Sequence, residues 1–366
     1  RIGLLPLYLE LYDDFRAALR DAFTPFLDEV RRRLSDAGLD VAVTDICRTA
    51  PEFKAAVARC EAGRVDALVT LHLAYSPSLE SVDALCATSL PLIMLDTTPD
   101  PAFGRDVDPA RLMFNHGIHG VQDLANLLRR RGRHYAIAAG ALRASNVIVR
   151  VAELARAARA ARAFGATRAL RIGPTFAGMG DFAVDDGLLR ERFGIEVVQA
   201  GVDALASTAA SVEDDAVESE MAADRQRYRV AAPDEVHRRS ARVGLALRRV
   251  LASGNHRALS MNFLAFDNDA PPVDTVPFLE ISKGMARGIG YGGEGDVLTA
   301  SLVGALIRGF ETATFTEIFC PDWEGDALFL SHMGEINPNV AAERPLLCEK
   351  DFPFTNAANP AFLACA

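Results

Sequence analysis

The chain has 366 residues, of which 50% are hydrophobic and 24% are charged, and its formal net charge is −10. This length exceeds what one hydrophobic core usually serves, so we expect two or three domains. The negative charge argues against a nucleic-acid-binding surface, and no apolar run reaches the ~20 residues of a membrane span. The six cysteines show no paired spacing, which is typical of a reducing compartment. With no signal-peptide pattern, we expect a cytoplasmic protein.

The first part of the chain alternates short apolar segments with amphipathic helical patterns. Such an alternation, with uncharged strands, predicts a parallel sheet covered by helices on both faces. Ligands of such sheets gather at the carboxyl ends of the strands, here segments 8–12, 72–77 and 96–100. The expected strands are 1–7, 40–46, 66–73 and 91–97, and the expected helices are 13–39, 51–63 and 78–86.

A second alternation predicts a second doubly wound domain, and after residue 310 the pattern changes to strands without helices between them. The fold expected from the sequence is α/β, with two consecutive Rossmann-like domains at 1–135 and 136–290. A β-rich, barrel-like C-terminal domain that this chain does not complete follows at 291–366 and carries the metal site. The strands of this part are expected at 134–140, 169–173, 195–199, 258–266, 312–319 and 326–333, and the helices at 146–164, 187–193, 202–229, 234–252 and 297–310.

Three ionisable residues near the end of the chain stand at the edges of apolar segments. Glu294 lies in the turn Gly-Gly-Glu-Gly-Asp, Glu317 interrupts the run TATFTEIF, and His332 ends the run DALFLSHM. Two carboxylates and an imidazole suit a divalent cation, Mn²⁺ or Mg²⁺ first, with Fe²⁺, Co²⁺ and Zn²⁺ as alternatives. The simpler interpretations are helix capping for the turn, a water-facing edge strand for Glu317 and a structural hydrogen bond for His332. Capping is the favoured interpretation of Asp296, and a shared metal site that of the other three.

The segment FNHGIHGVQDLANLL carries a second constellation. His116 and His119 are three residues apart, with Asn115 before them and Gln122 after them, so these polar groups share one helical face. No acid stands at the spacing of a zinc protease, which excludes HExxH chemistry. Hydrogen bonding to a polyhydroxylated substrate and capping of a helix start are equally good interpretations.

Six short segments, in order, resemble the L-arabinose isomerase and L-fucose isomerase superfamily, and its arabinose isomerase branch more closely. Each segment is short, but their common order is more specific than any one of them. The segments are VTLHLAYSP (69–77), NHGIHG (115–120), FAGMGDFAVD (176–185), GGEGD (292–296), TFTEIF (314–319) and SHMGEINP (331–338).

The resemblance implies a metal-dependent aldose–ketose isomerase in which two Glu and two His bind Mn²⁺. Glu294, Glu317 and His332 match three of these ligands, while the fourth, a histidine far downstream, has no counterpart in this chain. The two glutamates also serve as acid and base in the family. His119 matches a substrate-contacting histidine that a neighbouring subunit supplies, which implies a homo-oligomer, a trimer or hexamer, with shared active sites.

The resemblance also implies residues that line the sugar pocket. These are His116, Tyr75, Met179, Phe263 and Phe266. His116 stands where the family has Gln, and Gly180 stands where it has Arg, so the sugar stays open among pentoses, 6-deoxyhexoses and their derivatives.

The expected chemistry moves a carbonyl from C1 to C2 of a free monosaccharide through a cis-enediolate. One glutamate transfers the carbon-bound proton and the other the hydroxyl proton, and each such group contributes on the order of 10²–10⁴ in rate. Two alternatives stay open: a non-catalytic sugar-binding or regulatory protein on the same scaffold, and a sugar epimerase or lyase. The expected partner is a small sugar, with no nucleic acid and no membrane.

Overall fold

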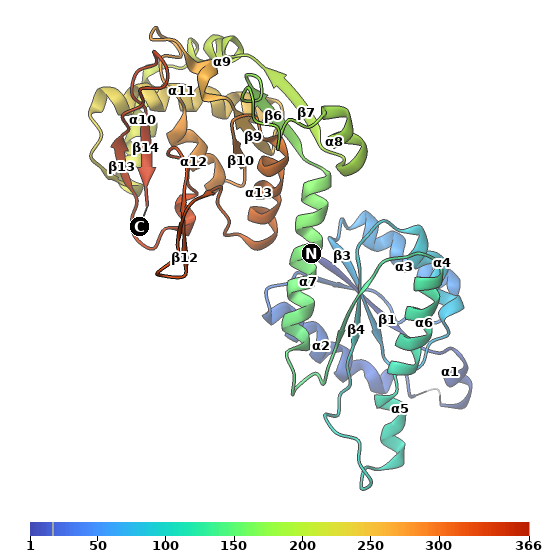
Figure 1. Cartoon of the computed structure of the whole chain (residues 1–366). Coiled ribbons are helices and arrows are strands. Elements are labelled where there is room, and N and C mark those ends of the chain that lie inside the picture. The colour runs from blue at the N-terminus through green and yellow to red at the C-terminus, as the bar shows by residue number, and fades with distance from the viewer. Residues whose placement is uncertain (17, 366) are drawn as a thin grey trace. The chain divides into compact units, whose positions relative to one another are not determined.

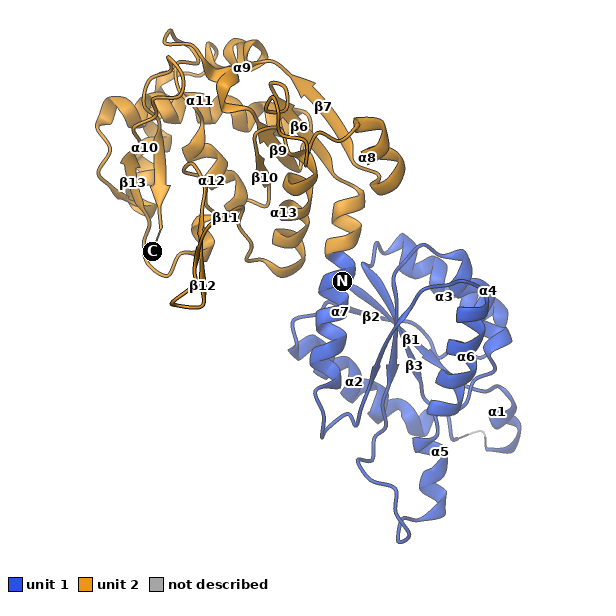
Figure 2. Ribbon diagram, viewed as in Figure 1, with its two compact units in different colours: residues 1–159 blue, residues 160–366 orange. Residues whose placement is uncertain are grey.

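The computed structural model describes residues 1–16 and 18–365. The chain divides into two compact units, Arg1–Arg159 and Ala160–Ala366 (Figure 2). No helix of the described residues is long and apolar enough to cross a membrane.

The first unit is built on a five-stranded sheet in the order β2-β1-β3-β4-β5, and every neighbouring pair of strands is parallel. Helices α2 and α7 pack on one face, and α3, α4 and α6 cover the other (Figure 1). A parallel sheet covered on both faces is the expected Rossmann-like architecture. The strands are β1 (Ile2–Leu7), β2 (Val41–Val43), β3 (Ala67–His72), β4 (Leu92–Asp96) and β5 (Ala136–Ala139). The helices are α1 (Leu11–Phe15), η1 (Asp21–Phe23), α2 (Thr24–Asp36), α3 (Ala50–Ala62), α4 (Ser78–Ala87), η2 (Pro109–Arg111), α5 (Leu112–Asn115), α6 (Ile118–Arg130) and α7 (Val147–Gly165).

Two details of this unit differ from the sequence-based expectation. The helix expected at 13–39 is divided, because Pro25 stands in the first turn of α2 and cannot continue a helix from the preceding residues. The strand expected to begin a central domain at 136 instead pairs in parallel with β4. The strand–helix alternation continues unbroken at this point, so local pattern does not reveal which sheet receives the strand.

The second unit contains a four-stranded parallel sheet in the order β10-β9-β6-β7. Helices α9, α11 and α12 contribute to the large core on one face, α8 packs with the smaller core on the other, and α13 contributes residues to both cores. The strands are β6 (Arg168–Ile172), β7 (Glu196–Ala200), β9 (Ala258–Met261) and β10 (Gly290–Gly293). The helices are α8 (Asp186–Phe193), α9 (Val202–Ala209), α10 (Asp214–Arg227), α11 (Asp234–Ser253), η3 (Phe263–Phe266), α12 (Phe278–Ala286) and α13 (Val297–Phe310).

The β-rich part of the chain begins at Glu317, later than the expected 291, because β10 and α13 belong to the parallel sheet and its cover. An antiparallel hairpin of β11 and β12 and a three-stranded sheet, β14-β13-β8, make up the remainder. Whether they form a barrel-like domain stays a prediction. Their bounds are β8 (Arg229–Val230), β11 (Glu317–Asp322), β12 (Ala327–Ser331), η4 (Pro338–Val340), β13 (Leu346–Glu349) and β14 (Ala361–Ala364).

Candidate metal centre

Glu294 stands directly after β10, at the carboxyl edge of the second sheet, in a backbone conformation that is unusual for a side-chain-bearing residue. Its φ is 60°, in the left-handed region, which costs on the order of 1–3 kcal/mol outside glycine. Its N–H donates to the carbonyl of Met261 and its carbonyl accepts from the N–H of Phe176, both at 2.9 Å. These two bonds hold the turn, so the strained residue keeps one orientation.

Asp296, two residues later, has a different task. Its Oδ1 accepts a hydrogen bond of 2.8 Å from the N–H of Thr299 in the first turn of α13. Asp296 is therefore the N-cap of that helix, as the sequence favoured.

Glu317 and His332 are brought together by the β11–β12 hairpin, in which Glu317 pairs with Ser331, the neighbour of His332. The Nε2 atom of His332 lies 3.9 Å from Oε1 of Glu317. One ligand atom each from Glu294, Glu317 and His332 lies within 4.8 Å of the others. The three residues that the sequence singled out therefore form one cluster.

The imidazole of His332 is positioned by neighbours on both sides. Phe315 meets the ring edge-to-face at a centroid distance of 4.7 Å. On another side the ring lies against the backbone of Gly293, where an added Cβ would stand 3.0 Å from both Cε1 and Nε2. Only glycine at position 293 lets the imidazole approach this closely.

Glu335 is the functional residue that sequence reasoning missed. Its carboxylate is 4% exposed, its Oε2 lies 2.8 Å from Nδ1 of His332, and its Oε1 accepts from the hydroxyl of Tyr291 at 2.8 Å. The bond at Nδ1 selects the tautomer that leaves Nε2, the nitrogen facing Glu317, with a free lone pair. Its signal in the sequence was an acid three residues after the histidine in SHMGEINP.

The cluster carries an excess of negative charge. Neither Glu294 nor Glu317 has a lysine or arginine partner among the described residues. Burial raises the pKa of Glu294; His332 opposes this shift, and the charges of Glu317, Glu335 and Asp181 add to it. Burial alone would lower the pKa of His332, but its bond to Glu335 and the surrounding carboxylates raise it.

The donor set fits a divalent cation. Ligands about 2.0–2.2 Å from one ion are at most about 4.4 Å apart, so the observed separations close with side-chain shifts below about 1 Å. A carboxylate that fixes the far nitrogen of a ligand histidine is the usual outer neighbour of a metal site. Two carboxylates without a lysine or arginine partner would be neutralised by the positive charge of a bound cation. Glu294, Glu317 and His332 are the residues that would hold the ion.

His116 and His119 lie in the first unit, at the start of α6. The Nε2 atom of His116 lies 3.1 Å from the hydroxyl of Tyr12 and its Nδ1 lies 3.0 Å from the carbonyl of Leu112, so both ring nitrogens have partners. His119 is exposed, and its ring meets that of His116 edge-to-face at 6.1 Å. His119 is therefore free to contact another molecule, whereas His116 is fixed in place.

Tyr75 is oriented by α6, because its hydroxyl donates to Asp123 at 3.2 Å. Beside it, His72 is fully enclosed, and neither of its ring nitrogens has a hydrogen-bond partner among the described residues. A Cβ added to Gly120 would stand 2.3 Å from Cδ2 of His72. The second glycine of NHGIHG thus lets α6 pack directly on this imidazole.

The remaining sequence-predicted residues of the sugar pocket lie in the second unit. Met179 is 38% exposed in the loop that follows β6. Phe263 and Phe266 belong to the large core and are 8% and 1% exposed, and Phe263 meets Phe352 edge-to-face at 5.7 Å. Their contact with a sugar stays a prediction.

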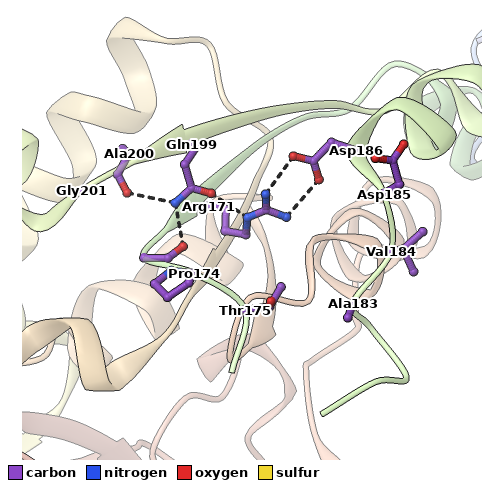
Figure 3. A pocket seen from close by; sticks show the side chains of 11 residues that line it. Arg171, Pro174, Thr175, Ala183, Val184, Asp185, Asp186, Gln199, Ala200 and Gly201 are labelled. Atoms are coloured by element: carbon purple, nitrogen blue, oxygen red, sulfur yellow. Dashed lines mark hydrogen bonds and ion pairs between the residues drawn. The ribbon is translucent and has the colours of Figure 1, made fainter. Parts of the chain in front are cut away.

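Two cavities lie near the cluster. One of about 370 Å³ is lined by His332 and Glu335 together with residues of the C-terminal strands. A larger one of about 910 Å³ lies at the carboxyl ends of β6 and β7 (Figure 3). There Arg171 donates to both oxygens of Asp186 at 3.0 and 2.8 Å and to Gln199 at 2.7 Å, so the central cation is already neutralised (Figure 3).

The fold and the cluster together define a class: an α/β protein with two parallel sheets and a candidate metal centre at the carboxyl edge of the second. Comparison with known proteins narrows this class. The family model described as "L-arabinose isomerase central domain" matches residues 175–308. This range contains β7 to β10, the Glu294 turn and most of α13.

Curated relatives of this chain carry the same family name. L-arabinose isomerase of Nocardioides sp. (strain ATCC BAA-499 / JS614) is 28% identical over 87% of this chain and 61% of its own length. The enzymes of that name from Shouchella clausii and Salmonella arizonae are each 26% identical, over 81% and 88% of this chain and 62% and 65% of theirs. The chain is therefore related to the arabinose isomerase branch, as its motifs indicated. It spans a little under two thirds of the length of these relatives.

Among solved structures, a sugar-binding protein of a sugar ABC transporter from Bacillus halodurans aligns over 90% of this chain and 92% of its own. The sequence identity is 10% and the TM-score is 0.21. A TM-score of this size is too low to indicate a shared fold.

Proposed function

We propose that this protein is a metal-dependent aldose–ketose isomerase acting on a free monosaccharide of the L-arabinose or L-fucose type or a derivative. The observation that carries the proposal is the convergence of Glu294, Glu317 and His332 in a chain related to L-arabinose isomerases. The buried Glu335 behind His332 adds support, because an imidazole held in this way is prepared to bind a cation. Mn²⁺ is the proposed ion, since carboxylates and an imidazole suit it, with Mg²⁺, Co²⁺, Fe²⁺ and Zn²⁺ as alternatives.

A bound divalent cation would withdraw charge from the sugar oxygens and so favour the cis-enediolate. The protein's own residues then have two tasks. One carboxylate of the pair Glu294 and Glu317 removes the proton from C2 and returns it to C1, and the other moves a proton between the two hydroxyl oxygens. The strained backbone of Glu294 supports this assignment, because such strain is kept where an exact side-chain position matters.

The sugar contacts are proposed from both units. Met179, Phe263 and Phe266 would line the pocket on the side of the metal centre. His119 would be supplied by a neighbouring copy in a homo-oligomer, a trimer or hexamer, and His116 and Tyr75 are further proposed sugar contacts. The exposure of His119 beside the fixed ring of His116 supports this role.

We also propose that the strands from Glu317 onward belong to a β-rich, barrel-like C-terminal domain. The β11–β12 hairpin supports this, because its apolar side chains Ile318, Phe329 and Leu330 are 67%, 61% and 51% exposed. Surfaces of this kind are usually covered by another part of the protein or by a partner. A cytoplasmic location is proposed from the free cysteines.

The test is an isomerisation assay of the full-length protein with a panel of aldoses, with and without Mn²⁺, in D₂O. We expect a ketose product that carries deuterium at C1 and that forms only when the metal is present. Turnover undiminished in chelator would contradict the metal assignment. Conversion of the aldose into an epimer, with no ketose, would favour an epimerase. Conversion into smaller fragments, with no ketose, would favour a lyase.

A further inference from the structure

A cavity of about 320 Å³ lies at the edge of the second sheet opposite to the metal centre. It is formed at the amino ends of β9 and β10 by the end of α11, by the turn that leads into β9 and by the residues after α12. Arg257 precedes β9 directly, and Arg287 and Ile289 precede β10.

The lining of this cavity is basic. Arg248, Arg257, Arg287 and His256 belong to it, and none of its described lining residues is acidic. Two other cavities that contain arginine differ, because Arg171 shares its cavity with two aspartates and the cavity near Cys47 balances three arginines with three acids. The acids that pair with Arg248 and Arg287, Glu220 and Glu280, are not among the lining residues, so the lining itself presents only basic groups to a ligand.

The arginines are held to different degrees. Arg248 is held in place by two glutamates that do not line the cavity. Its guanidinium donates to both oxygens of Glu220 at 3.0 and 2.6 Å and to both oxygens of Glu280 at 3.0 and 2.8 Å. Arg287 contacts Glu280 as well. The side chain of Arg257 is exposed and has no hydrogen bond or ion pair with another described residue. The N–H groups of Arg257 are available to a ligand. So are the N–H groups of Arg287 that do not contact Glu280.

His256 provides a second, independent observation. It is 6% exposed, it lines the cavity, and its Nδ1 has no hydrogen-bond partner among the described residues. A Cβ added to Gly254 would stand 2.1 Å from Nε2, so the opposite side of the ring packs on the chain. A buried polar atom without a partner is costly and points to a missing ligand or water.

We propose that this cavity binds a phosphate group, either inorganic phosphate or the phosphate of a small monoester. Planar guanidinium groups match phosphate oxygens with two parallel bonds, and a charge-assisted bond of this kind is about twice as strong as a neutral one. The volume leaves room for a small organic group beside the phosphate. The proposal does not depend on the isomerase function.

The cavity also adjoins the strand that carries the candidate metal centre. The N–H of Gly290, at the start of β10, donates to the carbonyl of Arg257 at 3.0 Å, and Glu294 follows the other end of that strand. An anion bound by the side chain of Arg257 would therefore lie beside a residue whose backbone is hydrogen-bonded to the start of β10.

The test is calorimetric titration of the full-length protein with inorganic phosphate and, separately, with ribose 5-phosphate. A chelator is present so that no metal-bound phosphate contributes. We expect saturable binding of at least one ligand, weakened about 10- to 100-fold by Arg257→Gln and by Arg287→Gln. Arg249→Gln is the matched control, because this neighbour of Arg248 donates to the carbonyl of Ser211 and does not line the cavity.

The two titrations distinguish the sources of the phosphate: tighter binding of the ester assigns the site to a phosphorylated metabolite, and equal binding assigns it to the free ion. Arg257→Gln decides the test if Arg287→Gln does not fold, because the Arg257 side chain supports no described contact. Absence of saturable binding by the unaltered protein would overturn the proposal. So would binding that Arg257→Gln and Arg249→Gln leave equally strong.

Discussion

The Oε2 atom of Glu335 lies 2.8 Å from Nδ1 of His332, while the other oxygen of the same carboxylate accepts from the hydroxyl of Tyr291. The buried acid thus joins a fixed tyrosine to the histidine of the candidate metal centre. It determines which ring nitrogen remains for a cation.

Replacement of Glu335 by glutamine should weaken Mn²⁺ binding about 10- to 100-fold, because the neutral amide no longer raises the basicity of the imidazole. Titration of Mn²⁺ by electron paramagnetic resonance measures the change. Tyr291→Phe is the matched control: it removes one hydrogen bond but keeps the carboxylate on His332, so its effect should be much smaller. Equal metal affinity in the unaltered protein and Glu335→Gln would refute this role.

The carboxylates of Glu294 and Glu317 should be essential to turnover, whereas Asp296 should not. Glu294→Gln and Glu317→Gln are each expected to lower kcat about 10²- to 10⁴-fold, because each removes a group that transfers a proton. Asp296→Asn changes an acid to an amide within the same turn but keeps an N-cap for α13. Initial rates with Mn²⁺ measure all three, and a similar loss in all three variants would mean that the turn, not the acid, matters.

Removal of metal should reverse the effect of Glu294→Gln on stability. In chelator the free energy of unfolding of the variant should exceed that of the unaltered protein by on the order of 1 kcal/mol, because the variant loses a half-buried charge that has no lysine or arginine partner. With Mn²⁺ at 100 times its dissociation constant, the unaltered protein gains about 2.7 kcal/mol and should become the more stable of the two. A variant that is less stable under both conditions would count against a cation site at Glu294.

Acid should destabilise the first unit through His72. Burial lowers the pKa of His72 from its ordinary 6.5 to about 3, and the charge of Asp123 opposes this only in part. The unfolded chain therefore binds more protons between these two values, so this contribution is complete above pH 6.5 and is lost as the pH falls toward 3. At pH 5 the loss is about 2 kcal/mol. Urea unfolding of the unaltered protein and of His72→Gln should show a steeper decline between pH 7 and pH 5 in the former, and parallel declines would disprove the assignment.

Gly120→Ala should destabilise the first unit by crowding the buried His72 ring against α6. The new Cβ would stand 2.3 Å from Cδ2 of the buried His72 ring, so one of the two groups must shift and we expect a loss of about 1–3 kcal/mol. Gly104→Ala is the control in the same unit, because nothing lies within 4 Å of its added Cβ. Thermal unfolding compares the two, and a neutral Gly120→Ala would show that α6 does not rest on His72.

The sequence by itself determined the alternation of strands and helices, the two parallel sheets and the residue types of the candidate metal centre. These features are local: an apolar period, a glycine-rich turn, or an acid at the edge of a buried run keeps its meaning without knowledge of what packs against it. Glu294, Glu317 and His332 were recognisable for this reason, and so was the capping role of Asp296.

Tertiary structure alone decided which groups meet. The sequence does not reveal that β5 joins the first sheet, since strand membership depends on which sheet edge the chain reaches. Nor does it reveal that Glu335 pairs with His332 and Tyr291, or that Arg257 and Arg287 line one cavity with no acid between them. Pairing of charges depends on distances and burial, and these are set by packing between elements that are far apart along the chain.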